Sequence, residues 1–126
     1  MDTLKKEING KSFTILCDYW GTRNSWGHEA ALYVDSKEIK SYKIRYYNRT
    51  WERYTFQSVI NACIYSALEE LKEELKAIYK KEKGFKLLTE ARKADFKEYL
   101  SLNADYKDLQ ALYNEFLFIY FFSLQG

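Results

Sequence analysis

Two arginines stand among four aromatic residues in the segment 46–54, which reads Tyr-Tyr-Asn-Arg-Thr-Trp-Glu-Arg-Tyr. A guanidinium group can stack on an aromatic ring and can also hold a phosphate through two hydrogen bonds. Arg49 and Arg53, together with the ring of Trp51, therefore form a candidate surface for a nucleotide base and its phosphate. The alternative is structural: Trp51 and Tyr54 would cover the core, while Arg49 would pair with the neighbouring glutamate or with the sheet.

A second candidate segment is the loop 21–28, where two glycines flank a run of hydrogen-bond donors. Glycine lets the backbone approach a ligand closely, and Arg23 and His28 add side-chain donors beside Gly27. The alternative is an ordinary hairpin loop with Trp26 folded onto the sheet. His28 is not a candidate general base, because the sequence offers it no partnered nucleophile.

The third candidate segment is 86–93, where a helix is expected to begin at Thr89. The N–H groups at a helix start attract phosphate, and Lys86, Arg92 and Lys93 would add positive charge there. The alternative is a capped helix with a solvated basic face. None of the three segments has the spaced carboxylates, Ser/His pair or phosphate-loop glycines that catalysis needs. We therefore expect a binding protein with no catalytic residue, metal or cofactor, and not an enzyme.

Alternating apolar residues predict three strands that would position these segments. The strands are expected at 12–20, 28–34 and 39–47, with a polar turn at 35–38. Short polar connections between consecutive strands favour an antiparallel meander. The change from a period of two to a helical period falls at 46–54, so the arginine-rich segment joins the sheet to a helix.

Three helices are expected after the sheet. The first is long, with an apolar stripe that continues to Ile78, lysines in its last turn and Gly84 as a left-handed cap. Thr89 can cap a second helix that reaches about Leu100, and Asn103 can cap a third. The predicted fold class is α+β, a three-stranded antiparallel β-meander followed by three α-helices.

Length and composition limit the possible classes. The 126 residues suit a single domain, 1–126, with its sheet at 1–50 and its helical part at 51–126. The net charge of +2 argues against general nucleic-acid binding. Two cysteines and one histidine cannot build a structural zinc site. Cys17 and Cys63 fall on predicted core faces, which indicates reduced, buried thiols in a cytosolic protein.

The two ends of the chain bear on targeting and assembly. Residues 1–11 contain no apolar run and so predict no signal peptide, and the apolar run 116–124 is too short to cross a bilayer. The segment 116–122 is apolar on every side of its helix. Such a helix is either central in the fold or covered by another subunit, and we expect a homodimer formed through it.

Three stretches of the sequence resemble small phage proteins that act as anti-Thoeris signal sponges of the first type. The stretches are 17–28, the segment 46–54 with its Asn-Arg-Thr-Trp-Glu core, and 88–93, which reads Leu-Thr-Glu-Ala-Arg-Lys. The resemblance implies a non-enzymatic protein in the cytoplasm of the infected bacterial host. It would sequester cyclic ADP-ribose isomers made by bacterial TIR-domain proteins. Some members also hold cyclic di- or trinucleotides at a separate site.

The same resemblance implies an assembly and a set of contact residues. The assembly would be a homodimer, with a hexamer, a trimer of dimers, as its larger form. Contacts to a cyclic oligonucleotide would come from Arg23, Gly27, His28, Thr89, Ala91 and Arg92. Contacts to the ADP-ribose signal would come from Trp20, Arg49, Trp51, Arg53 and Phe85.

Two other functions fit the same residue types. One is a protein–protein inhibitor of a bacterial defence complex, such as an anti-CRISPR protein, with aromatic residues as binding hot spots. The other is a small single-stranded nucleic-acid module in which Tyr42, Tyr46 and Trp51 would stack on bases. The near-neutral charge disfavours the second of these. Recessed rings beside arginine would favour the sponge, and a flat exposed aromatic patch would favour the inhibitor.

Overall fold

The computed structural model of the chain describes residues 2–23, 25–46 and 56–125. In these residues a four-stranded antiparallel sheet, in the order β1-β2-β3-β4, is followed by three helices. The strands are β1 (Asp2–Ile8), β2 (Lys11–Gly21), β3 (Trp26–Val34) and β4 (Lys37–Tyr46). The helices are α1 (Phe56–Lys83), α2 (Glu90–Leu102) and α3 (Ala104–Gln125). The predicted α+β class with a long first helix is confirmed, but the predicted number of three strands is wrong.

The strand that the sequence pattern missed is β1, at one edge of the sheet. Its register places Lys6 opposite Phe13 on the helix-facing side, where the Lys6 ammonium lies 3.0 Å from the carboxylate of Glu115 in α3. A charged residue in a core-facing position breaks the apolar alternation from which strands are predicted. The signal that marks this hairpin is Asn9-Gly10, whose φ angles of 51° and 79° fit a two-residue turn.

The β2–β3 hairpin has a shorter loop than predicted. Trp20 pairs with Gly27 and Tyr19 pairs with His28, so Gly27 and His28 are strand residues. The predicted loop 21–28 is therefore wrong in extent, and the connection consists of residues 22–25. Regular cross-strand pairing continues as far as Gly21 and Trp26, beyond the point at which the residue types change.

The β3–β4 connection is also shorter than predicted. Asp35 and Ser36 have positive φ angles of 49° and 71°, as a two-residue hairpin turn requires, and β4 already begins at Lys37. The Asp35 carboxylate accepts a hydrogen bond of 2.9 Å from the Ser12 N–H, which ties this turn to the start of β2.

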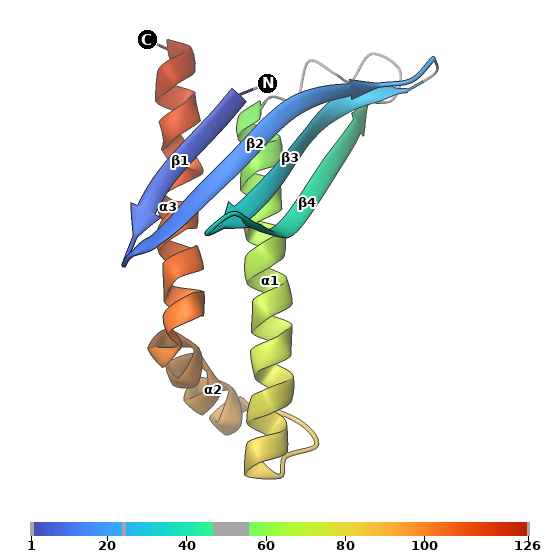
Figure 1. The fold of residues 1–126 in the computed structure, drawn as a ribbon. Coiled ribbons are helices and arrows are strands. Elements are labelled where there is room, and N and C mark those ends of the chain that lie inside the picture. Colours follow the sequence, from blue (N-terminus) through green and yellow to red (C-terminus); the bar gives the residue numbers. More distant parts are fainter. Residues whose placement is uncertain (1, 24, 47–55, 126) are drawn as a thin grey trace.

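Helices α1 and α3 lie side by side across one face of the sheet (Figure 1). α1 packs on β2, β3 and β4, and α3 packs on α1 and β1. Strand alternation and the helical stripe both direct apolar side chains into the space between these layers. We call the residues buried there the main core. Its most buried large side chains include Phe13, Ile15, Leu32, Ile60, Leu112 and Phe116.

The C-terminal half of α1 continues beyond the sheet, and α2 folds back beside it (Figure 1). A second group of buried residues, the distal cluster, forms there from Leu75, Tyr79, Phe96 and Leu100. The tilted rings of Tyr79 and Phe96 lie 5.4 Å apart between centroids, so aromatic contacts hold α2 against α1.

The helix boundaries follow the predicted signals. Gly84 ends α1 with a φ of +71°, a conformation that favours glycine. Thr89 occupies the N-cap position of α2 as predicted, but its side chain makes no capping hydrogen bond. The Asn103 side chain does cap α3, because it accepts a hydrogen bond of 2.9 Å from the Tyr106 N–H.

An ion-pair group fastens the β1–β2 turn to α3. The Lys11 ammonium donates to Asp105 at 2.6 Å and to Asp108 at 2.8 Å, and the Asn9 amide donates to Asp108 at 2.8 Å. Asp108 is only 3% exposed. The hydrogen bonds from Lys11 and then Asn9 lower the pKa of Asp108, and those to Asp105 and Asp108 raise the pKa of Lys11. This group joins the sheet to the helical layer.

Both cysteines are buried thiols that are not joined in a disulfide, as predicted from their positions on core faces. Burial raises the pKa of the Cys63 thiol to about 12, so it stays protonated at physiological pH. Among the described residues, no helix combines the length and apolar character that a bilayer crossing requires. The predicted dimer face at 116–122 falls mostly outside the described side chains.

Candidate functional site

The β2–β3 connection carries the first group of predicted ligand contacts. Arg23 is exposed there. The Thr22 N–H donates to the Ser25 carbonyl at 2.6 Å, and the Thr22 hydroxyl donates to the same oxygen at 3.3 Å. Two of the donors that the sequence offered to a ligand are therefore used within the turn itself.

His28 lies on the helix-facing side of β3, within the strand that was predicted at 28–34. It is 7% exposed, and its ring centroid lies 4.6 Å from that of Tyr19 on the neighbouring strand. Burial lowers the pKa of His28 below its ordinary value. A neutral, buried imidazole offers a phosphate no charge, so Arg23 is the stronger anion contact at this end of the sheet.

Trp20 lies next to these residues in the sheet, but its side chain is on the opposite face. Its indole N–H donates to the His28 carbonyl at 3.2 Å, and the Lys43 ammonium lies 5.5 Å from its ring centroid. Lys43 also lies 3.5 Å from Glu29. Trp20 is thus oriented by strand neighbours, and its cation partner is a lysine that the sequence analysis did not single out.

Most of the arginine-rich segment 46–54 lies outside the described residues. Tyr46 ends β4, opposite Trp26. Arg49, Trp51 and Arg53 lie outside the described residues, so their predicted role in binding stays a prediction.

The connection between α1 and α2 brings two predicted ligand residues into contact. The guanidinium carbon of Arg92 lies 3.8 Å from the centroid of the Phe85 ring. One Arg92 N–H donates to the Leu87 carbonyl at 3.3 Å. The Phe85 ring also packs on the distal cluster, with its centroid 6.1 Å from that of Tyr79. The distal cluster therefore holds the Phe85 ring in place, and this ring in turn positions the Arg92 guanidinium.

The start of α2 adds main-chain donors to this arrangement. The first hydrogen bond of its helical ladder runs from the Lys93 N–H to the Thr89 carbonyl, at 2.8 Å. The N–H groups at 90–92, including that of Ala91, consequently have no helical carbonyl within reach. Lys86 is exposed nearby, whereas Lys93 is paired with Glu90 at 2.9 Å. A cation, a ring and helix-start amides therefore meet in one place.

The two groups of predicted contacts lie at opposite ends of the molecule. The β2–β3 connection is at the upper end of the sheet in Figure 1, and the α1–α2 connection is at the lower end of the helices. One chain therefore does not bring Arg23, Gly27 and His28 next to Thr89, Ala91 and Arg92. At each end, however, a residue that the resemblance assigns to the ADP-ribose signal contacts one that it assigns to a cyclic oligonucleotide. Trp20 contacts His28 at one end, and Phe85 contacts Arg92 at the other.

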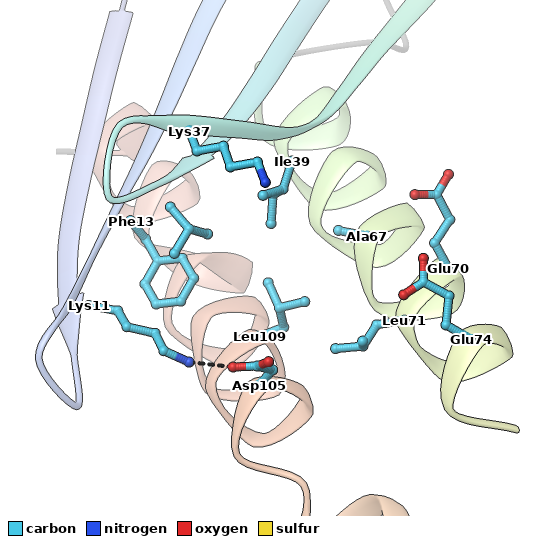
Figure 2. A pocket seen from close by; sticks show the side chains of 11 residues that line it. Lys11, Phe13, Lys37, Ile39, Ala67, Glu70, Leu71, Glu74, Asp105 and Leu109 are labelled. Atoms are coloured by element: carbon cyan, nitrogen blue, oxygen red, sulfur yellow. Dashed lines mark hydrogen bonds and ion pairs between the residues drawn. The ribbon is translucent and has the colours of Figure 1, made fainter. Parts of the chain in front are cut away.

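The structure also contains a hollow that sequence reasoning missed. It has a volume of about 380 Å³ and lies between the turns at the lower end of the sheet and helices α1 and α3 (Figure 2). Its lining residues come from five elements and from positions far apart in the sequence. No single segment therefore carries a signal for it, and we name it the sheet–helix hollow.

Comparisons with models of protein families, with curated proteins and with solved structures find no match to this chain. In the described part of the chain, no group of three or more His, Cys, Asp or Glu side chains is placed to hold a metal ion.

Proposed function

We propose that the protein binds a cyclic nucleotide signal of bacterial defence and sequesters it without degrading it. The signal would be a cyclic ADP-ribose isomer or a cyclic oligonucleotide, in the cytoplasm of a phage-infected bacterium. The observation that carries this proposal is the Arg92 guanidinium over the Phe85 ring at 3.8 Å, beside the start of α2.

This arrangement suits a ligand that combines phosphate groups with planar rings. Arg92 has five N–H donors and uses one on the Leu87 carbonyl, which leaves others for phosphate oxygens. The helix-start N–H groups and the positive end of the α2 dipole favour the same negative charge. Because Phe85 and Leu87 already hold the guanidinium in place, binding would cost little side-chain entropy.

Sequestration asks nothing further of the site. A sponge holds its ligand by stacking, ion pairing and hydrogen bonds, and it forms no covalent bond. The proposed protein is accordingly not an enzyme.

Its two groups of candidate contacts, at opposite ends of one chain, fit an assembly in which one protomer supplies Arg23 and its partner supplies Arg92 to the same ligand. This supports the homodimer, or the trimer of such dimers, that the sequence resemblance implies.

The proposal is tested by ligand release. Purified protein is incubated with a mixture of cyclic ADP-ribose isomers and cyclic di- and trinucleotides, washed, and denatured by heat, and the released molecules are identified by mass spectrometry. The proposal predicts recovery of at least one signal with its mass and retention unchanged. Release of a cleaved product would show an enzyme instead. No retention of any signal would contradict the proposal.

A second candidate function is an inhibitor that binds a bacterial defence complex. The observation in its favour is the exposure of Tyr19 (67%) and Trp26 (44%) at the upper end of the sheet. Exposed aromatic side chains of this kind act as hot spots in protein interfaces. If this function holds, a Tyr19→Ser/Trp26→Ser variant loses capture of a purified defence complex, while Arg92→Ala keeps it. The sponge predicts no capture by any of these proteins.

A further inference from the structure

We propose that the sheet–helix hollow is a binding site for a small zwitterion with an apolar side chain, the chemistry of a free hydrophobic amino acid. The hollow is separate from the start of α2 and is not part of the proposed cyclic nucleotide site. Its volume of about 380 Å³ falls within the range of small-molecule sites in proteins, near the low end.

The floor of the hollow is apolar. Phe13 comes from β2, Leu71 from α1 and Leu109 from α3, and Figure 2 shows their side chains turned toward the same space. Phe13 and Leu109 belong to the main core, at 2% and 6% exposed. Their positions are therefore fixed by packing, and an apolar ligand side chain would find a preformed surface.

The rim of the hollow carries charges of both signs. Three of its charged residues already take part in ion pairs, because Lys11 pairs with Asp105 and Glu70 pairs with Lys40. Lys37, from the start of β4, and Glu74, from α1, line the same hollow and take part in no ion pair with another described residue. One exposed amine and one exposed carboxylate outside these ion pairs thus line the same hollow as the apolar floor.

This charge pattern selects the ligand class. A carboxylate of the ligand would pair with Lys37, and its ammonium group would pair with Glu74. A nucleotide fits poorly, because Glu74 would repel its phosphate groups and the amine of Lys11 is already paired with carboxylates. A purely apolar molecule would leave both rim charges without a partner. The zwitterion with an apolar side chain satisfies the floor and the rim together.

The test uses L-phenylalanine as the probe, titrated into the full-length protein and followed by isothermal calorimetry and by amide chemical shifts. Two analogues remove one charge each: N-acetyl-L-phenylalanine lacks the ammonium group, and phenethylamine lacks the carboxylate. L-Glutamate is a zwitterion without the apolar side chain. The variants are Lys37→Met and Glu74→Gln, both at rim positions that do not support the core. Lys97→Met and Glu98→Gln, on the exposed surface of α2, are the matched controls.

We expect saturable binding of L-phenylalanine, with shifts in the amides of the lining residues and no binding of L-glutamate. Each rim variant should weaken binding by about tenfold or more, as loss of a hydrogen bond to a charged group does, and the controls should not. Glu74→Gln should bind N-acetyl-L-phenylalanine no worse than the parent protein does. Absence of saturable L-phenylalanine binding, or binding that both rim variants leave unchanged, would overturn the proposal.

Discussion

The half of the molecule under the sheet and the half beyond it are built differently. Under the sheet, Ile15, Leu32 and Ile60 are completely buried between the sheet and the layer of helices. Beyond it, the distal cluster has four buried residues, each 4–6% exposed, between α1, α2 and the start of α3. From this comparison we expect the sheet-covered half to supply most of the stability, whereas the distal half carries Arg92 on Phe85 near its surface.

The largest effects are expected from matched leucine truncations in the two halves. Leu112→Ala removes a side chain that is 0% exposed in the main core, and Leu100→Ala removes one that is 6% exposed in the distal cluster. We expect losses of about 3–5 kcal/mol and about 2–3 kcal/mol respectively, because a cavity in a rigid core relaxes less. Urea unfolding followed by circular dichroism measures both. A larger loss at Leu100 would contradict the comparison.

The ion-pair group that joins sheet and α3 should have the next largest effect. Asp108→Asn keeps the shape of the side chain but removes the charge that Lys11 and Asn9 contact. We expect a loss of about 1–3 kcal/mol in the free energy of unfolding. Glu115→Gln is the control, because its ion pair with Lys6 is much more exposed and should contribute at most about 1 kcal/mol. Equal losses of unfolding free energy in Asp108→Asn and Glu115→Gln would show that burial of the carboxylate does not determine the contribution of its ion pair.

The same aspartate predicts a pH dependence. Its pKa is lowered in the folded chain, so its stabilising effect is complete above the pKa of the unfolded chain and is lost as the pH falls through the folded value. The stability difference between the parent protein and Asp108→Asn should therefore shrink below about pH 4. Unfolding curves recorded between neutral and acidic pH measure this difference. A stability difference between the two proteins that grows on acidification would contradict the lowered pKa of Asp108.

Much of the fold could be predicted from residue patterns. The long α1 stripe, Gly84 at its end and Asn103 as the cap of α3 were read correctly because each depends on local chemistry. β1 was missed because Lys6 occupies a core-facing position and its partner Glu115 lies more than a hundred residues away. Asn9-Gly10 was a local signal that would have revealed the hairpin.

The candidate sites were harder to predict than the fold. The contact between Phe85 and Arg92 joins residues close in sequence, so a pattern could point to it. The separation of Arg23 from Arg92 cannot be predicted from a local pattern, because it depends on the three-dimensional arrangement of the sheet and the helices. The sheet–helix hollow also needed the structure, because Lys37 and Glu74 line the same space only when the chain has folded.

A smaller effect concerns the two thiols, which report on the sheet-covered half alone. Cys17 and Cys63 are both 0% exposed, so a thiol reagent should reach them only when that half opens. We expect no rapid labelling of the native protein at pH 8. Leu112→Ala should speed labelling, and Leu100→Ala should speed it less. Rapid labelling of the parent protein would mean that the main core is not closed.

The most direct test of the central proposal compares two arginine variants at the two ends of the molecule. Isothermal calorimetry would give the Kd of a cyclic ADP-ribose isomer and of a cyclic trinucleotide for the parent protein, Arg92→Ala and Arg23→Ala, with Arg92→Lys as the charge-retaining control. Because Arg92 rests on Phe85, we predict that Arg92→Ala weakens both ligands by about tenfold or more and that Arg92→Lys restores only part of the loss. Arg23→Ala should weaken the trinucleotide alone. Parent-like binding of both ligands by Arg92→Ala would contradict the proposal.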